Sequence, residues 1–247
     1  MKFVLLFLIS FVSLEAVVSI SPVNIGDKPG FSGTLSGSFE TKRGNTDKDD
    51  YTAGVRVEYD NNSSYLVWAD MSFSYGEASG ETNTNKTFAH IRYIHRLYKE
   101  LLDWESFVQS EGNEFTLVEN RTLFGMGIRY DADFQAYGDA YVGLGLFYEM
   151  ISYTTDIDPN EYNTRVNLYL AYRKDFSKDI KLSYLGYYQP RLDDGDDYIC
   201  SNTMELKVRL YKRVYINFRY NYNIDNRPAI TVRKIDVSQK TSFVYEF

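Results

Sequence analysis

The sequence predicts an all-β protein, a transmembrane antiparallel β-barrel of about twelve strands. After residue 30, apolar and polar side chains alternate with period two along most of the chain. The polar side of this alternation carries many charged residues, and the connections between the alternating segments are short and long in turn. Successive side chains of a strand point to opposite faces of a sheet. In a membrane barrel the apolar face meets lipid, and the polar face lines the interior.

The composition limits the class of protein before any motif is considered. The chain has 247 residues, of which 44% are hydrophobic, with 23 Tyr and 16 Phe, and disordered chains are poor in aromatic residues. A net charge of −7 argues against nucleic-acid binding, which requires a basic surface. The single cysteine, Cys200, and the two histidines, His90 and His95, predict no internal disulfide, no Cys-based zinc site and no His-rich metal centre. We expect no metal site and no cofactor.

The first residues have the layout of a secretory signal peptide. Lys2 gives a positive start, residues 3–14 are an apolar run, and the small residues Ala16 and Ser19 offer cleavage positions. The run is shorter than the roughly 20 apolar residues that a membrane-spanning helix needs. We therefore predict a signal peptide over residues 1–16, with cleavage after Ala16 or Ser19, and a barrel over residues 30–247. The alternative is a buried N-terminal helix.

Twelve segments carry the alternation, and most are long enough for a tilted strand to cross a bilayer. The fifth is the weakest, and a misreading of the fifth or seventh would give ten or fourteen strands. The segments are 31–39, 51–59, 65–75, 89–93, 102–109, 121–130, 142–149, 165–173, 180–184, 203–210, 214–222 and 234–247.

The connections favour a barrel over a soluble β-sandwich, which would bury the apolar face between two sheets. Short periplasmic turns and longer external loops alternate in outer-membrane barrels. Several apolar faces also end in Tyr or Phe, as in an interfacial girdle. The predicted short connections are 60–64, 98–100, 131–134, 174–178 and 211–213, and the long ones are 41–50, 76–86, 110–115, 154–162, 190–201 and 224–229. This pattern places both ends of the mature chain on the periplasmic side.

Two stretches carry a resemblance to a known family. Residues 30–47 read GFSGTLSGSFETKRGNTD, and residues 75–86 read YGEASGETNTNK. This small-residue-rich first strand, its Gly-Asn-Thr turn and the following loop resemble the salt-induced outer membrane protein family, a domain of unknown function from Gram-negative bacteria. The alternating Phe243, Tyr245 and Phe247 resemble the aromatic ending by which outer-membrane proteins are recognised for assembly. The resemblance implies a barrel in the cell outer membrane of a Gram-negative bacterium, and it brings no substrate and no catalytic residues.

The interior charges suggest a narrow, porin-like channel for passive diffusion of small hydrophilic solutes, with a mild preference for anions. Inward small residues such as Gly125 and Gly143 leave room for water, and charged side chains select ions in pores. A basic wall is predicted from Arg165, Arg173, Lys181, Lys207, Arg209 and Arg219. An acidic wall is predicted from Glu58, Asp70, Asp103 and Glu105.

Three alternatives stay open. The interior charges could pair across a closed lumen, giving a non-conducting structural barrel that acts through its external loops under osmotic or salt stress. Asp70, Ser72 and His90 all face inward, but an inward Ser and His are too common to predict a catalytic site, and we expect no enzyme. The acidic residues Asp193, Asp194, Asp196 and Asp197, with Asp156 and Asp158, could bind Ca²⁺, although their spacing does not fit an EF-hand.

The expected partners follow from the location. We expect contacts with outer-membrane lipid and lipopolysaccharide and with the outer-membrane assembly machinery, and none with nucleic acid. No sequence feature demands a trimer, so a monomer is expected.

Overall fold

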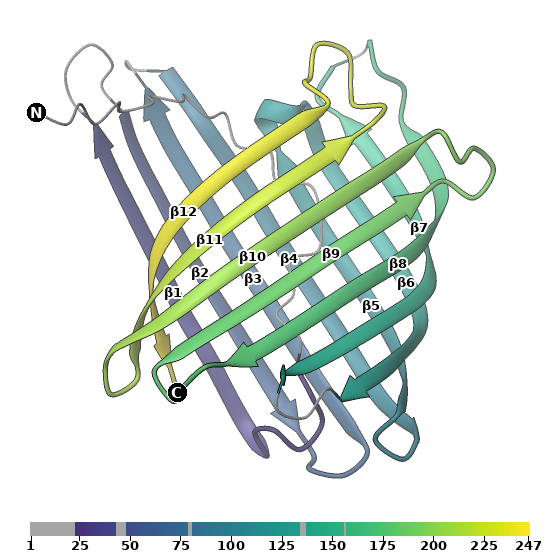
Figure 1. Cartoon of the computed structure of the whole chain (residues 1–247). Coiled ribbons are helices and arrows are strands. Elements are labelled where there is room, and N and C mark those ends of the chain that lie inside the picture. The colour runs from purple at the N-terminus through teal and green to yellow at the C-terminus, as the bar shows by residue number, and fades with distance from the viewer. Residues whose placement is uncertain (1–22, 43–47, 79–80, 134–136, 156) are drawn as a thin grey trace, which may run out of the picture.

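The structure is a closed barrel of twelve antiparallel strands. It is a computed structural model that describes residues 23–42, 48–78, 81–133, 137–155 and 157–247. Each strand pairs with the next one along the chain, and the last closes the cylinder by pairing with the first (Figure 1). The prediction of a twelve-stranded antiparallel barrel is confirmed. The predicted signal peptide and both cleavage positions lie outside the described residues.

The strands, except β12, extend farther than the alternation predicts. They are β1 Gly30–Lys42, β2 Lys48–Asp60, β3 Tyr65–Ala78, β4 Glu81–Tyr98, β5 Leu102–Asn113, β6 Val118–Asp133, β7 Asp139–Tyr153, β8 Glu161–Asp175, β9 Ile180–Pro190, β10 Tyr198–Tyr211, β11 Val214–Asp225 and β12 Ile235–Glu246. In β4 and β9 the sequence predicted less than half of the strand, only residues 89–93 and 180–184. In β9 the alternation is obscured because Leu185 and Tyr187 are buried inside the barrel.

Several predicted loops are partly strand. The connection predicted over residues 76–86 is wrong, because β3 continues to Ala78 and β4 begins at Glu81. Polar pairs such as Ser74 with Lys86 continue the ladder there. Likewise β5 runs on to Asn113 and is followed by a single 3₁₀ turn, Glu114–Thr116. No helix in the described residues is long and apolar enough to cross a membrane.

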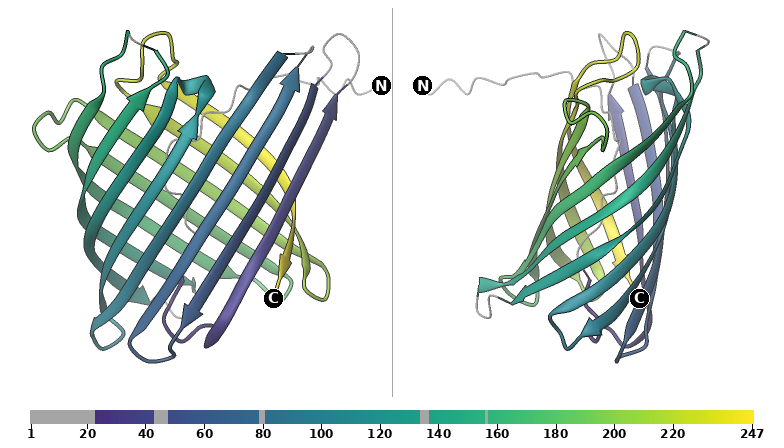
Figure 2. Two further views of the ribbon diagram at one scale, coloured as in Figure 1. Left: turned by 180° about the vertical axis from the view of Figure 1, so that it is seen from behind. Right: turned by 90° about the vertical axis from the view of Figure 1, so that its right-hand side faces the viewer.

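The two ends of the barrel differ. The turns after β2, β4, β8 and β10 lie at one end, called the turn end here, and the long connections after β7, β9 and β11 lie at the other, the loop end (Figures 1 and 2). The loop end also has short connections, because β3 ends at Ala78 and β4 begins at Glu81. The start of β1 at Gly30 and the C-terminus at Phe247 both lie at the turn end.

The outer surface is apolar between two aromatic zones, and the one toward the loop end includes Phe39 and Tyr51. Outward side chains of the middle of the strands, such as Met126 and Leu144, are more than half exposed. Toward the turn end, aromatic rings of neighbouring strands contact one another in a row. The ring centroids lie 4.9 Å apart for Phe31 and Tyr59, 6.1 Å for Tyr59 and Tyr65, and 5.8 Å for Tyr65 and Tyr93. An apolar band with aromatic girdles is the outer surface of a membrane-spanning barrel.

The seam that closes the barrel is short. Four residue pairs join β1 to β12, from Thr34 with Glu246 to Gly37 with Phe243, whereas thirteen join β1 to β2. Gly33 and Phe247 add two backbone hydrogen bonds, with N···O distances of 3.1 and 3.0 Å.

Candidate functional site in the barrel lumen

One side of the lumen is filled by aromatic side chains. They belong to β3, β5, β7, β8 and β9, and the buried rings are Trp68, Phe107, Tyr141, Phe147, Tyr169 and Tyr187. Inward glycines opposite these rings provide the space. A Cβ atom on Gly125 would lie 2.3 Å from the ring of Phe107, and one on Gly143 would lie 2.0 Å from that of Tyr169.

This arrangement corrects the prediction that inward glycines leave room for water. Gly125 and Gly143 make room for aromatic rings. Gly127 and Gly145 lie directly opposite each other, and a Cβ on either would collide with the backbone of the facing strand. On this side of the barrel, small residues therefore mark close packing.

Two buried arginines lie among the rings. Arg92 lies 5.1 Å from the ring centroid of Phe107 and donates a hydrogen bond of 3.1 Å to Glu105. Arg129 lies 4.7 Å from the ring centroid of Tyr141 and pairs with Asp103 at 2.5 Å. Each guanidinium thus has both a carboxylate and an aromatic face, which compensates its loss of water. We call the six rings together with Arg92 and Arg129 the aromatic–arginine cluster.

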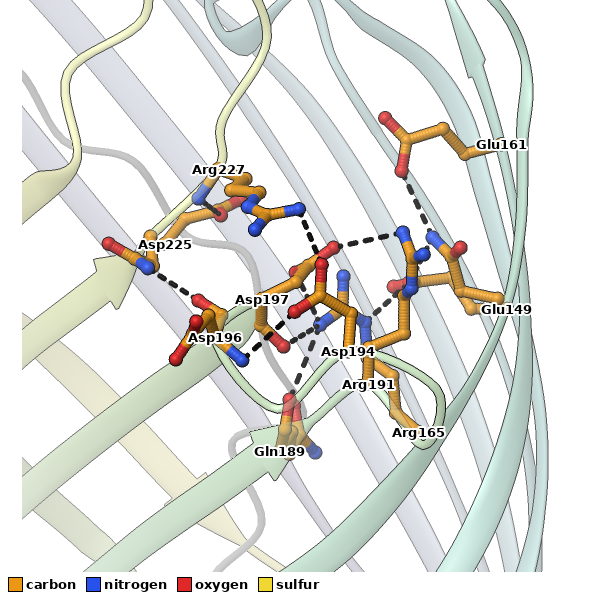
Figure 3. A network of polar contacts seen from close by, with 12 residues as sticks. Glu149, Glu161, Arg165, Gln189, Arg191, Asp194, Asp196, Asp197, Asp225 and Arg227 are labelled. Atoms are coloured by element: carbon orange, nitrogen blue, oxygen red, sulfur yellow. Dashed lines mark hydrogen bonds and ion pairs between the residues drawn. The ribbon is translucent and has the colours of Figure 1, made fainter.

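A buried ionic network continues this filled side toward the loop end (Figure 3). Arg121, directly opposite Glu111, pairs with it at 2.9 Å and also with Glu149. Arg165 joins Glu149 at 2.7 Å to Asp197 at 2.9 Å. All five side chains are buried. Buried charges are tolerated only when they are paired and hydrogen-bonded, and here every carboxylate faces at least one guanidinium.

The network reaches the loop between β9 and β10. Arg191 pairs with Asp193 at 2.6 Å, and Arg227 pairs with Asp194 at 2.8 Å. The hydrogen bond from Arg191 lowers the pKa of the Asp193 carboxyl. These aspartates are therefore engaged by arginines.

The structure does not support the suggested Ca²⁺ site in this loop. Within the described residues, no group of His, Cys, Asp and Glu side chains is arranged to hold a metal ion. Asp158 instead accepts a hydrogen bond of 3.1 Å from the backbone N–H of Ile230, and Asp156 lies outside the described residues. Cys200 is a half-buried free thiol on β10.

The opposite side of the lumen is open and polar. A cavity of about 270 Å³ is lined mainly by β1 to β3 and β9 to β12, with further residues from β4, β5 and β8. We call this space the polar cavity. Its hydroxyl-bearing lining residues are Thr34, Ser36, Ser38, Thr52, Ser72, Ser74, Thr87, Ser183 and Ser242. Charged residues of both signs complete the lining, so the cavity can hydrate or bind polar solutes.

The predicted basic and acidic walls are not uncompensated charged surfaces, because most of their residues form ion pairs. In the basic set, Arg165 pairs with Glu149 and Asp197, Arg173 with Asp27 and Asp139, Lys207 with Glu246, Arg209 with Asp179, and Arg219 with Glu205. In the acidic set, Glu58 pairs with Arg56, Asp103 with Arg129, and Glu105 with Arg92. Lys181 and Asp70 line the polar cavity.

Strand register explains these pairs. Glu205 lies directly opposite Arg219, Asp103 opposite Arg129, and Asp139 opposite Arg173. Residues directly opposite each other on one face of antiparallel strands are neighbours. Alternation alone shows which face a residue occupies, but not which residue it meets. The same register could have revealed the filled side, because Gly125 lies opposite Phe107 and Gly143 opposite Tyr169.

Of the candidate catalytic residues, Asp70 lies directly opposite His90, whereas Ser72 and His90 have different surroundings. Ser72 lies opposite Phe88 and lines the polar cavity. His90 is buried in a stack, with its ring centroid 4.7 Å from that of Trp68 and 5.6 Å from that of Phe107. Its Nδ1 lies 3.0 Å from Oε1 of Gln109. His90 is thus a packing residue of the filled side.

The three residues of the predicted assembly signal lie on one face of β12. Phe243, Tyr245 and Phe247 all point outward and are 61%, 43% and 47% exposed. They are accessible at the turn end, beside the seam.

Comparison with known proteins identifies the family. A family model described as "Protein of unknown function, DUF481" matches residues 36–247. The chain belongs to the DUF481 family. Comparison of this DUF481 protein with curated proteins gives no match.

Solved structures with the same fold are bacterial outer-membrane proteins. An outer membrane channel from Pseudomonas putida F1 superposes with a TM-score of 0.59 at 11% identity, covering 93% of this chain and 100% of that one. The translocator domain of the autotransporter NalP from Neisseria meningitidis gives a TM-score of 0.52 at 13% identity, covering 90% of each chain. At these identities the likeness concerns the fold alone. The DUF481 barrel therefore has the fold of bacterial outer-membrane proteins.

Proposed function

We propose that this protein is a narrow outer-membrane channel for passive diffusion of small hydrophilic solutes. The observation that carries the proposal is the polar cavity beside the filled side of the lumen. A barrel of about eight strands is filled by its side chains, and one of sixteen or more leaves an aqueous channel. Twelve strands filled on one side leave an off-centre passage of limited width.

The lining supports only a mild preference for anions. Among the described residues around the polar cavity, the cationic side chains are Lys28, Arg56, Lys86, Arg173, Lys181, Lys207, Arg219 and Lys240. The acidic ones are Asp27, Glu58, Asp70, Glu111, Asp175, Glu205 and Glu246. The two signs nearly balance, so a strongly ion-selective pore is not expected. The suitable solutes are small polar molecules, neutral or weakly acidic.

The proposal includes a location and an assembly route. The apolar band and aromatic girdles suit the cell outer membrane of a Gram-negative bacterium, where lipid and lipopolysaccharide would surround the barrel. The outward aromatic residues of β12 would serve the assembly machinery. A monomer is sufficient, because the polar cavity is formed within one barrel.

The direct test is single-channel recording of the purified, refolded protein in planar bilayers. Conductance steps are expected. Ser72→Trp places a bulky ring in the polar cavity and is expected to lower the step size. Met71→Trp places the same ring on the outer surface of the same strand, where the native side chain is 52% exposed, and is expected to leave the step unchanged. A complete absence of steps in every form of the protein that is demonstrably folded would reject the channel.

The second candidate is a non-conducting barrel that supports the envelope under osmotic or salt stress through its loops. The observation that favours it is the ionic network joining the lumen to the external loop at Asp194 and Asp197. A stress-dependent loss of membrane integrity in a deletion strain, restored equally by native protein and by Ser72→Trp, would favour this candidate.

A further inference from the structure

A segment before the first strand lies inside the turn end of the barrel. It comprises residues 23–28 and is called the lumen segment here. Ile25 is 5% exposed and belongs to the buried apolar cluster of the lumen, and Val23 packs against that cluster. The segment therefore occupies interior space that is bounded by strands far from it in sequence.

Arginines of the barrel wall hold the backbone of the lumen segment. Arg129 on β6 donates to the carbonyl oxygen of Val23 at 2.9 Å, and Arg96 on β4 donates to that of Ile25 at 3.1 Å. Arg129 also pairs with Asp103, so the anchoring group is itself fixed.

Two further polar contacts anchor the segment. Asp27 pairs with Arg173 on β8 at 2.6 Å, and the backbone N–H of Gly26 donates to Asp60 on β2 at 2.7 Å. The contacts thus reach β2, β4, β6 and β8, on several sides of the lumen.

The lumen segment also borders the proposed passage. Val23, Asn24, Asp27 and Lys28 all line the polar cavity. The segment therefore narrows the route between the cavity and the turn end. Its bonds to the wall are made by wall side chains, so it can leave without breaking the ladder between strands. Over residues 23–28 it has no ladder of backbone hydrogen bonds to a neighbouring strand, and such segments open at lower free energy than the strands of the sheet.

We propose that the lumen segment is a gate: docked on Arg96, Arg129 and Arg173 it restricts the turn-end mouth, and undocked it opens the polar cavity. The inference rests on the proposed channel function and adds its regulation. Two populated positions of the segment would appear as two conductance levels, whose occupancies follow their free-energy difference.

Reversible cross-linking tests the docked position and the gating separately. Asn24 Nδ2 lies 3.5 Å from Asp131 Oδ2 on β6, so cysteines at these positions are within reach of a short bis-methanethiosulfonate reagent. The variant is Asn24→Cys with Asp131→Cys in a Cys200→Ser background. Cross-linking is expected to hold conductance at the low level, and a reductant is expected to raise the open probability several-fold. Asn24→Cys alone, treated identically, should show no such change.

A deletion gives the complementary result. Removal of residues 23–28 leaves every strand intact, because β1 begins at Gly30. The deletion variant is expected to fold, as shown by heat-modifiable gel mobility, and to reside mainly at the high conductance level. Ile25→Asn, which keeps the length of the chain, is expected to shift the occupancies in the same direction.

The outcomes separate the two proposals. Failure of the reagent to join the two cysteines in folded protein would overturn the docked position and the gate, but not the channel. Efficient cross-linking with equal conductance before and after reduction would overturn the gate alone. Absence of conductance in every form, including the deletion variant, would overturn the channel and the gate together.

Discussion

The buried charged side chains of the lumen depend on their ion-pair partners. Arg121 illustrates this, because it lies between Glu111 and Glu149 and all three are buried. Replacing a whole buried ion pair by apolar groups is often harmless, whereas removing one partner leaves an uncompensated charge away from water. The arginines of the lumen are therefore structural residues, whatever solute passes beside them.

The first prediction concerns Arg121→Met. This variant is expected to lower the free energy of unfolding by about 3–5 kcal/mol, because two buried carboxylates lose their counterion. Urea unfolding in detergent micelles or lipid vesicles, followed by tryptophan fluorescence, measures the change. The control is Arg227→Met, which removes a half-exposed loop ion pair and should cost less than about 1 kcal/mol. Equal costs for the two variants would contradict the structural role of the network.

The second prediction concerns Gly143, whose missing Cβ makes room for the ring of Tyr169. Gly143→Val is expected to destabilise the barrel by about 1–3 kcal/mol through overpacking. In a Tyr169→Ala background the same change should cost much less, which a double-mutant cycle of unfolding free energies would show. Gly37→Val is the control, because a Cβ there meets its nearest neighbour at 3.9 Å. An equal cost of Gly143→Val in both backgrounds would reject the packing explanation.

At the scale of elements, β12 pairs with β1 along the short seam, and Phe247 follows directly after it. The backbone of Phe247 bonds with Gly33, while its side chain remains accessible. The strand thus has a structural contribution from its backbone and a proposed recognition role for its rings.

The third prediction separates these contributions. Phe247→Ala is expected to reduce the amount of barrel assembled in the outer membrane, and deletion of Phe247 to reduce it further, because the two backbone bonds to Gly33 are also lost. Membrane fractionation with heat-modifiable gel mobility measures assembled protein. Leu144→Ala removes an outward apolar side chain from β7 and serves as the control. Native-level assembly of Phe247→Ala would contradict the assembly role of the ring.

The accuracy of the strand predictions followed the chemistry of the interior. In β11 and β12 the inward residues are largely polar, so the alternation was clear, and each predicted bound lies within three residues of the observed one. In β9 the inward Leu185 and Tyr187 resemble the apolar outer face, and the predicted strand stopped too early. Twelve strands and their order were accessible from sequence, but their ends were not, because hairpin ladders continue into polar residues.

At the scale of the whole molecule, the lumen has two dissimilar sides. The sequence placed Arg165, Arg219 and Asp103 inside correctly, but their partners depend on register across strands. The lumen segment was also missed, because residues 23–28 carry no alternation and precede the first strand. Only the closed barrel shows which charged residues border the polar cavity. Lys181 is the clearest example, because it lines that cavity.

The fourth prediction is that Lys181 contributes to ion preference. Lys181→Glu reverses a charge in the lining of the polar cavity and is expected to shift the reversal potential in a salt gradient toward cation preference. Lys212→Glu makes the same charge change in the turn between β10 and β11 and is the control. An unchanged reversal potential in a conducting Lys181→Glu channel would place the ion path elsewhere.

The unequal filling of the cylinder has a consequence for how such a protein can diversify. The aromatic–arginine cluster and the ionic network stabilise the barrel from the filled side. The hydroxyl-bearing residues that line the polar cavity therefore contribute less to its stability. Substitutions at Ser36, Ser74 or Ser183 can then alter which molecules are admitted with little effect on the scaffold. The same barrel can in this way acquire a different solute preference through changes of a few small side chains.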